Sequence, residues 1–140
     1  MKKIISCVGY YQEKPFTPQL LDEIVELIEN EKIKRPEIEI DLNDSKSGVS
    51  NLHLGLLIPL DFESHKKLWC LTIRLNNKLF CYSKSQSREF DWYLYCGAET
   101  EVVNSCILDY ELLRSIVLDV CKDGVIDLKD WVPIREAQNL

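Results

Sequence analysis

Apolar residues recur at helical spacing in two segments of the chain. The first follows Thr17 and Pro18, where a threonine N-cap precedes a proline at the first helical position. Its apolar positions are Leu20, Leu21, Ile24, Leu27 and Ile28. The second follows Asp109, another N-cap residue, and stops at Gly124. Its apolar positions are Leu112, Leu113, Ile116, Val117, Val120 and Cys121. The spacing predicts one helix from Pro18 and a second from Asp109.

Strict alternation of apolar and polar residues predicts strands elsewhere in the chain. The segment EIEIDL, residues 37–42, places Ile38, Ile40 and Leu42 on one face and Glu37, Glu39 and Asp41 on the other. Other alternating segments are residues 52–58, 68–75, 78–83 and 90–96, and Lys3 to Gly9 is rich in β-branched residues. The pair Asn76-Asn77 suits a two-residue hairpin turn, because Asn tolerates positive φ.

The connecting segments complete the expected fold. Residues 43–50 contain Gly48 and no apolar period, which predicts a mobile loop. We expect a turn at Gly9, a weak strand near Val102 and Val103, and a short extended tail over residues 126–134. Successive strand signals flanked by helices predict a single α+β domain over residues 1–140. In this fold, two main helices pack on a curved antiparallel β-sheet meander, with the first strand central.

The strand predicted over residues 90–96 has two different faces. Phe90, Trp92 and Leu94 share one face with Cys96, whereas Asp91, Tyr93 and Tyr95 share the other. We expect the second face to be exposed, with its tyrosines acting as anchors for a protein partner, because buried aromatic residues carry much of the energy of a typical interface. Packing of both tyrosines between sheet and helix is the alternative.

Composition limits the class of protein. At 140 residues, with 46% hydrophobic and 29% charged residues, the chain suits one globular domain with one core. The N-terminal apolar stretch is short and lacks a small-residue cleavage site, and no segment approaches a membrane span. The six cysteines, without a C-x-x-C pair, are then expected to be reduced core thiols of a cytoplasmic protein.

Charge points to a basic protein partner. The formal net charge is −6, and acids are concentrated in residues 22–44 (nine acids, three bases) and 89–140 (eleven acids, four bases). An acidic surface opposes nucleic-acid binding and favours a basic protein. The candidate binding residues are the helix acids Asp22, Glu26 and Glu29 and the strand acids Glu37, Glu39 and Asp41. The alternative is that these acids are simply a well-solvated surface, and whether they form one patch is open.

Catalytic and metal-binding patterns are weak. A Cys–His nucleophile would need His53 or His65, which lie on the polar face of a strand and in a charged loop. The spacing of Asp123, Asp127 and Asp130 does not match a calcium-binding loop, and the glycines form no nucleotide-binding motif. We therefore expect no enzyme activity, no metal and no cofactor.

The order of elements resembles that of short bacterial immunity proteins from polymorphic toxin and contact-dependent growth inhibition systems. The matching features are VGYY after the first strand, the Pro-led helix, EIEIDL, the tryptophan-bearing meander, YLYCG and a closing helix ending in CKDGVIDL. The resemblance implies a cytoplasmic protein that binds the C-terminal domain of one cognate toxin, often a nuclease, and blocks its active site or substrate surface. A generic acidic interaction domain is the alternative, and an enzyme with an unrecognised site is the third possibility.

Overall fold

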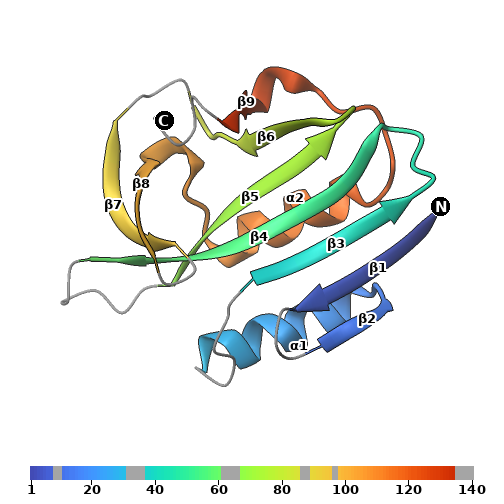
Figure 1. Ribbon diagram of the computed structural model, residues 1–140, viewed down its shortest axis with the longest axis horizontal. Coiled ribbons are helices and arrows are strands. Elements are labelled where there is room, and N and C mark those ends of the chain that lie inside the picture. Colours follow the sequence, from blue (N-terminus) through green and yellow to red (C-terminus); the bar gives the residue numbers. More distant parts are fainter. Residues whose placement is uncertain (8–10, 31–36, 61–66, 86–88, 96–97, 135–140) are drawn as a thin grey trace.

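The computed structural model describes residues 1–7, 11–30, 37–60, 67–85, 89–95 and 98–134. Within these residues, nine strands form one antiparallel sheet with the path β2-β1-β3-β4-β5-β6-β9, and β7 and β8 branch from β4 (Figure 1). The strands are β1 (Lys2–Cys7), β2 (Tyr11–Pro15), β3 (Glu37–Asn43), β4 (Val49–Pro59), β5 (Leu68–Leu75), β6 (Lys78–Tyr82), β7 (Phe90–Tyr95), β8 (Ala98–Val103) and β9 (Trp131–Pro133). The predicted α+β class, a meander sheet with two helices, is confirmed.

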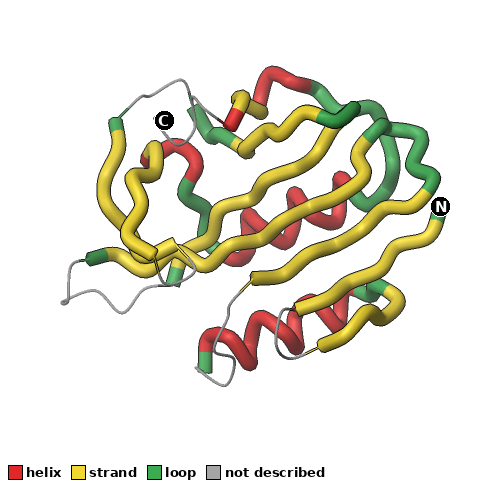
Figure 2. Tube along the Cα trace, viewed as in Figure 1, coloured by secondary structure: helices red, strands yellow, loops and turns green. Residues whose placement is uncertain are grey.

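Both α-helices begin at their predicted caps. In α1 (Pro18–Glu29), Thr17 Oγ1 accepts a hydrogen bond from Leu20 N at 3.0 Å, and in α2 (Tyr110–Val120), Asp109 Oδ1 accepts one from Leu112 N at 2.9 Å. These contacts satisfy backbone N–H groups that the first turn of a helix leaves without partners. The helices lie behind the strands in the view of Figures 1 and 2.

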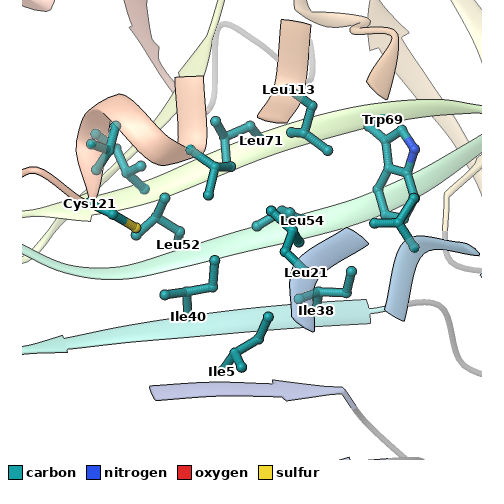
Figure 3. Packing of buried hydrophobic residues seen from close by; sticks show 14 of the residues in the cluster. Ile5, Leu21, Ile38, Ile40, Leu52, Leu54, Trp69, Leu71, Leu113 and Cys121 are labelled. Atoms are coloured by element: carbon teal, nitrogen blue, oxygen red, sulfur yellow. The ribbon is translucent and has the colours of Figure 1, made fainter. Parts of the chain in front are cut away.

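The main core, which we call the first core, lies between the helices and one face of the sheet. Leu21 from α1 and Leu113 from α2 pack in one cluster with Ile38 from β3 (Figure 3). The strand side chains of this cluster alternate along the chain, as the sequence pattern requires. Its members from the sheet include Ile5, Ile38, Ile40, Leu42, Leu52, Leu54, Leu56, Trp69, Leu71 and Ile73.

A second core lies on the opposite face, at one end of the sheet. Leu57 and Cys70 belong to it, whereas their chain neighbours Leu56 and Trp69 belong to the first core, so the two cores lie on opposite faces. The hairpin of β7 and β8 and the 3₁₀-helix η1 (Asn104–Cys106) cover this end through Val102, Val103, Cys106 and Ile107. The long strand β4 makes this possible, because it pairs with β3 and β5 and then continues to pair with β7 at residues 57–59.

The structure confirms some of the expected connections and changes others. Asn76 and Asn77 have φ values of 49° and 67°, as the predicted hairpin turn requires. The predicted short extended tail is found in part: its middle forms the 3₁₀-helix η2 (Leu128–Asp130), and the extended residues that follow form β9, which pairs with β6. The edge strand β2 was not predicted, and it leaves β1 second from the edge. The expected turn at Gly9 and the residues Cys96 and His65 lie outside the described residues.

The loop between β3 and β4 is tied down rather than free. The Asp123 carboxylate accepts hydrogen bonds from Lys46 N at 2.7 Å and Ser47 N at 2.9 Å. These hydrogen bonds connect the segment after α2 to the β3–β4 loop, a contact that the sequence pattern did not predict. They also lower the pKa of Asp123 below its usual 3.8.

Candidate functional site

The strand acids lie on a sheet face that the helices do not cover. Ile38, Ile40 and Leu42 of β3 point into the first core, so Glu37, Glu39 and Asp41 point to the opposite side. The second core covers only one end of that side. We call the remainder the open face, and by strand register it comprises Ile4, Ser6, Glu37, Glu39, Asp41, Asn51, His53 and Arg74, whereas Thr72 on the same side is buried. Glu39 is exposed, whereas Glu37 and Asp41 are half-buried.

His53 lies between this acidic strand and the β7–β8 hairpin. Its Nδ1 is 3.1 Å from the hydroxyl oxygen of Tyr95, and its Nε2 is 3.8 Å from Glu37 Oε1. Asp41 Oδ1 accepts a hydrogen bond from Asn51 Nδ2 at 2.8 Å on the same face. The contacts orient the imidazole and tie the hairpin to the edge of the open face. They place one histidine beside a carboxylate, and they supply no nucleophile.

The five cysteines that the structure describes do not complete a thiol–imidazole pair with His53. Cys7, Cys70, Cys81, Cys106 and Cys121 are all buried. Cys81 Sγ lies 3.2 Å from Cys70 Sγ, and hydrogen bonds with Cys106 and Cys70 together with burial raise the pKa of the Cys81 thiol. A thiol with a raised pKa forms little thiolate, which is the nucleophilic form. These cysteines therefore act as core residues of the described structure.

The helix acids lie on the other side of the molecule. Asp22 joins the two helices, because its carboxylate accepts hydrogen bonds from Arg114 Nε at 2.8 Å, from Arg114 Nη2 at 3.1 Å and from the Tyr110 hydroxyl. The Arg114 contact holds the pKa of Asp22 below its usual 3.8. Glu26 and Glu29 are exposed on α1. The two acidic sets predicted from sequence therefore form two separate surfaces, on opposite sides of the sheet.

The prediction for the two faces of β7 is wrong. Tyr93 and Tyr95 are half-buried and pack against the second core, whereas Phe90 and Trp92 are 44% and 48% exposed. The hairpin covers the end of the sheet where the second core lies, and a tyrosine can fill space there while its hydroxyl meets a polar partner. Tyr95 does this above Gly55, whose missing Cβ leaves room for the ring. The alternating pattern correctly divided the residues of β7 into two faces, but it did not show that the face with Tyr93 and Tyr95 packs against the second core.

Asp91 and Tyr93 line a small hollow between the hairpin and the start of α2. The hollow has a volume of about 310 Å³ and is lined by Leu68, Lys84, Asp91, Tyr93, Asn104, Ile107 and Asp109. Burial, with the Asp91 charge as a smaller cause, raises the pKa of Tyr93. Asn104 Oδ1 is buried and has no hydrogen-bond partner. Sequence reasoning identified Asp91 and Tyr93 and missed the rest of the lining.

A larger groove of about 750 Å³ runs along α2 beside residues 125–131. Its lining includes Arg114 and Lys122 as well as Glu111, Asp119 and Asp127. Both signs of charge are present, and none of the residues predicted to bind a partner takes part. The groove therefore does not identify a ligand class.

The described residues form neither a metal-binding cluster nor a membrane-spanning helix. In the described ranges, no group of three or more His, Cys, Asp or Glu side chains is placed to hold a metal ion. No helix in the same ranges is long and apolar enough to cross a membrane. A scan against protein-family models, a search of curated proteins and a search of solved structures each return no match.

Proposed function

We propose that this protein acts in the cytoplasm as an immunity protein, which binds the basic C-terminal domain of a cognate toxin and neutralises it. The observation that carries the proposal is the row of Glu37, Glu39 and Asp41 on the open face. Carboxylates at every second strand position repeat at about 7 Å, so several basic side chains can meet them at once. The resemblance in element order adds the toxin-neutralising role.

Electrostatics explains how such a face would block a nuclease. A nuclease presents Lys and Arg residues to nucleic-acid phosphates. An acidic protein can occupy the same basic surface, and complementary charge also speeds the encounter. The net charge of −6 favours this approach from a distance, and Glu37, Glu39 and Asp41 would make the short-range contacts.

The second candidate is a generic acidic interaction domain without a toxin partner. The exposed Phe90 and Trp92 favour it, because aromatic residues are enriched among the residues that dominate protein interfaces. They lie on the outer side of the hairpin, away from the second core. A partner bound there would not need the open face.

Where a large secreted protein is encoded beside this chain, co-expression with its C-terminal domain tests the proposal. We expect growth rescue and a one-to-one complex on co-purification. The double variant Glu37→Lys with Glu39→Lys should weaken the complex about 10- to 100-fold and abolish rescue, because it reverses charge on the open face.

The matched control is Glu26→Lys with Glu29→Lys, which makes the same charge change on the helix side. We expect this variant to change affinity less than about threefold and to keep rescue, because rim and remote charges contribute little. A loss of binding confined to the helix-side variant would reject the open face as the contact surface. Absence of both rescue and complex with the neighbouring toxin domain would favour the generic interaction domain.

A further inference from the structure

The hollow behind β7 has the composition of a binding site for a small cationic group. Its lining includes two acidic residues, Asp91 from β7 and Asp109 from the start of α2, together with Tyr93. Leu68 and Ile107 supply the apolar part of the lining. A volume of about 310 Å³ is at the small end of ligand sites, and it suits one polar head with a short apolar stem.

Asn104 adds an acceptor without a partner. Its Oδ1 is buried and makes no hydrogen bond, although buried polar atoms in proteins are nearly always paired. Asn104 is also one of the residues that line the hollow. A ligand that donates hydrogen bonds would thus satisfy an atom that is otherwise left unpaired.

The charges in the hollow favour a cation over an anion. Asp91 and Asp109 outnumber Lys84. Asp109 also caps α2, so part of its charge is balanced by the helix N-terminus, and one of its oxygens already accepts from Leu112 N. Asp91 therefore carries the larger share of the attraction. The Lys84 ammonium group repels a bound cation. Removing the charge of Lys84 should therefore strengthen cation binding, whereas removing the charge of Asp91 should weaken it.

We infer that this hollow binds the guanidinium group of an arginine side chain from the protein partner. The inference rests on the proposed function and names a contact of the same complex. Arginine is preferred to lysine because its planar group donates several hydrogen bonds at once, to carboxylate, amide and hydroxyl oxygens. Its stem lies against Leu68 and Ile107.

The first experiment needs no partner. Methylguanidinium is titrated into the ¹⁵N-labelled protein, and amide shifts are followed by NMR, with methylammonium as the comparison. We expect saturable shifts centred on Tyr93, Asn104 and Asp109, with a Kd in the range of about 1–50 mM, as a group of so few atoms allows. Methylammonium should bind several-fold more weakly.

Three variants give the direction of the effect. Asp91→Asn should weaken methylguanidinium binding about fivefold or more, and Lys84→Gln should strengthen it. The matched control is Glu99→Gln, which removes one carboxylate from the same hairpin on strand β8, outside the lining of the hollow, and should leave the Kd unchanged. The same spectra report whether each variant is folded.

Two results would overturn the inference. One is the absence of saturable shifts around the hollow, and the other is the reverse order of the variants, with sulfate binding in place of methylguanidinium. In the toxin complex, Asp91→Asn should lower affinity about tenfold, whereas an unchanged Kd would reject the arginine contact and leave the proposed function intact. If no toxin domain binds, the proposed function fails, and the methylguanidinium titration still decides whether the hollow recognises this group.

Discussion

Gly55 is the residue on which the edge of the open face depends. A Cβ built at this position would lie 2.3 Å from Cε2 and 2.7 Å from Cζ of Tyr95. The Tyr95 ring occupies that space, and its hydroxyl lies within hydrogen-bond distance of His53 Nδ1. The absence of one methyl group therefore allows the hairpin to pack on the sheet.

Gly55→Ala should destabilise the protein by about 1–3 kcal/mol, because the added methyl group must displace the ring of Tyr95 or the backbone of β4. The free energy of unfolding in urea measures this. Gly124→Ala is the control, since a Cβ there meets no atom within 4 Å, and it should change stability by less than about 1 kcal/mol. Equal effects of the two substitutions would contradict the packing of Tyr95 against Gly55.

Trp92 provides a direct check of how the hairpin is oriented. It is 48% exposed, whereas Trp69 is fully buried and Trp131 is 8% exposed. Acrylamide, a neutral quencher that the acidic surface does not repel, should quench mainly Trp92. We expect Trp92→Phe to remove most of the quenchable fluorescence and Trp131→Phe to leave it. Strong quenching that survives Trp92→Phe would show the opposite orientation.

At the scale of elements, two carboxylates join segments that are far apart in the sequence. Asp22 connects α1 to α2 through Arg114 and Tyr110, and Asp123 connects the end of α2 to the β3–β4 loop. Arg114 lowers the pKa of Asp22, and the backbone N–H groups of Lys46 and Ser47 lower that of Asp123. Both contacts depend on the ionised form of the carboxylate.

These shifts predict how stability depends on pH. A carboxyl group whose pKa is lower in the folded state stabilises the protein above its unfolded pKa of about 4, and this contribution is lost as pH falls through the folded pKa. Asp123→Asn should therefore be less stable than the wild type at pH 7, and the difference should shrink below about pH 4. Urea unfolding from pH 7 to pH 2.5 measures it.

The control for this series is Asp119→Asn, because the Asp119 side chain is 82% exposed and its ion pair with Lys122 is long, at 3.9 Å. Such surface pairs contribute about 0–1 kcal/mol. The difference between this variant and the wild type should remain small throughout. A gap between Asp123→Asn and the wild type that widens toward low pH would contradict the role given to Asp123.

At the scale of the whole molecule, the sheet separates two acidic surfaces. The helix side carries Glu26 and Glu29, and the open face carries Glu37, Glu39 and Asp41. Their combined charge acts at long range. The hollow lined by Asp91 lies against the hairpin that covers the other end of the same sheet side.

Charge-driven binding predicts a strong dependence on salt. Raising NaCl from 50 to 500 mM should weaken the toxin complex at least about tenfold, mainly through a slower association rate, because salt shortens the range of the acidic field. Surface plasmon resonance measures both rate constants. An affinity that does not change with salt would point to the apolar Phe90 and Trp92 as the main contact.

The sequence by itself determined the elements whose signals are local. Thr17 and Asp109 cap the helices, the Asn76-Asn77 pair makes the hairpin turn, and alternation in EIEIDL separates buried from exposed residues. These features depend on hydrogen bonds and side-chain directions within a few residues, so the pattern is enough to predict them. The α+β fold follows from their order.

Only the tertiary structure decided which surfaces the acids share and which way β7 faces. Alternation divides a strand into two faces but does not say which of them meets the core, and Tyr95 turned inward because Gly55 left room across the sheet. The short strands β2 and β9 and the binding of Asp123 to a distant loop depend on partners supplied by chain segments far away. Contacts between distant segments leave no periodic pattern in the sequence. The open face and the hollow are formed by such contacts, so only the tertiary structure reveals them.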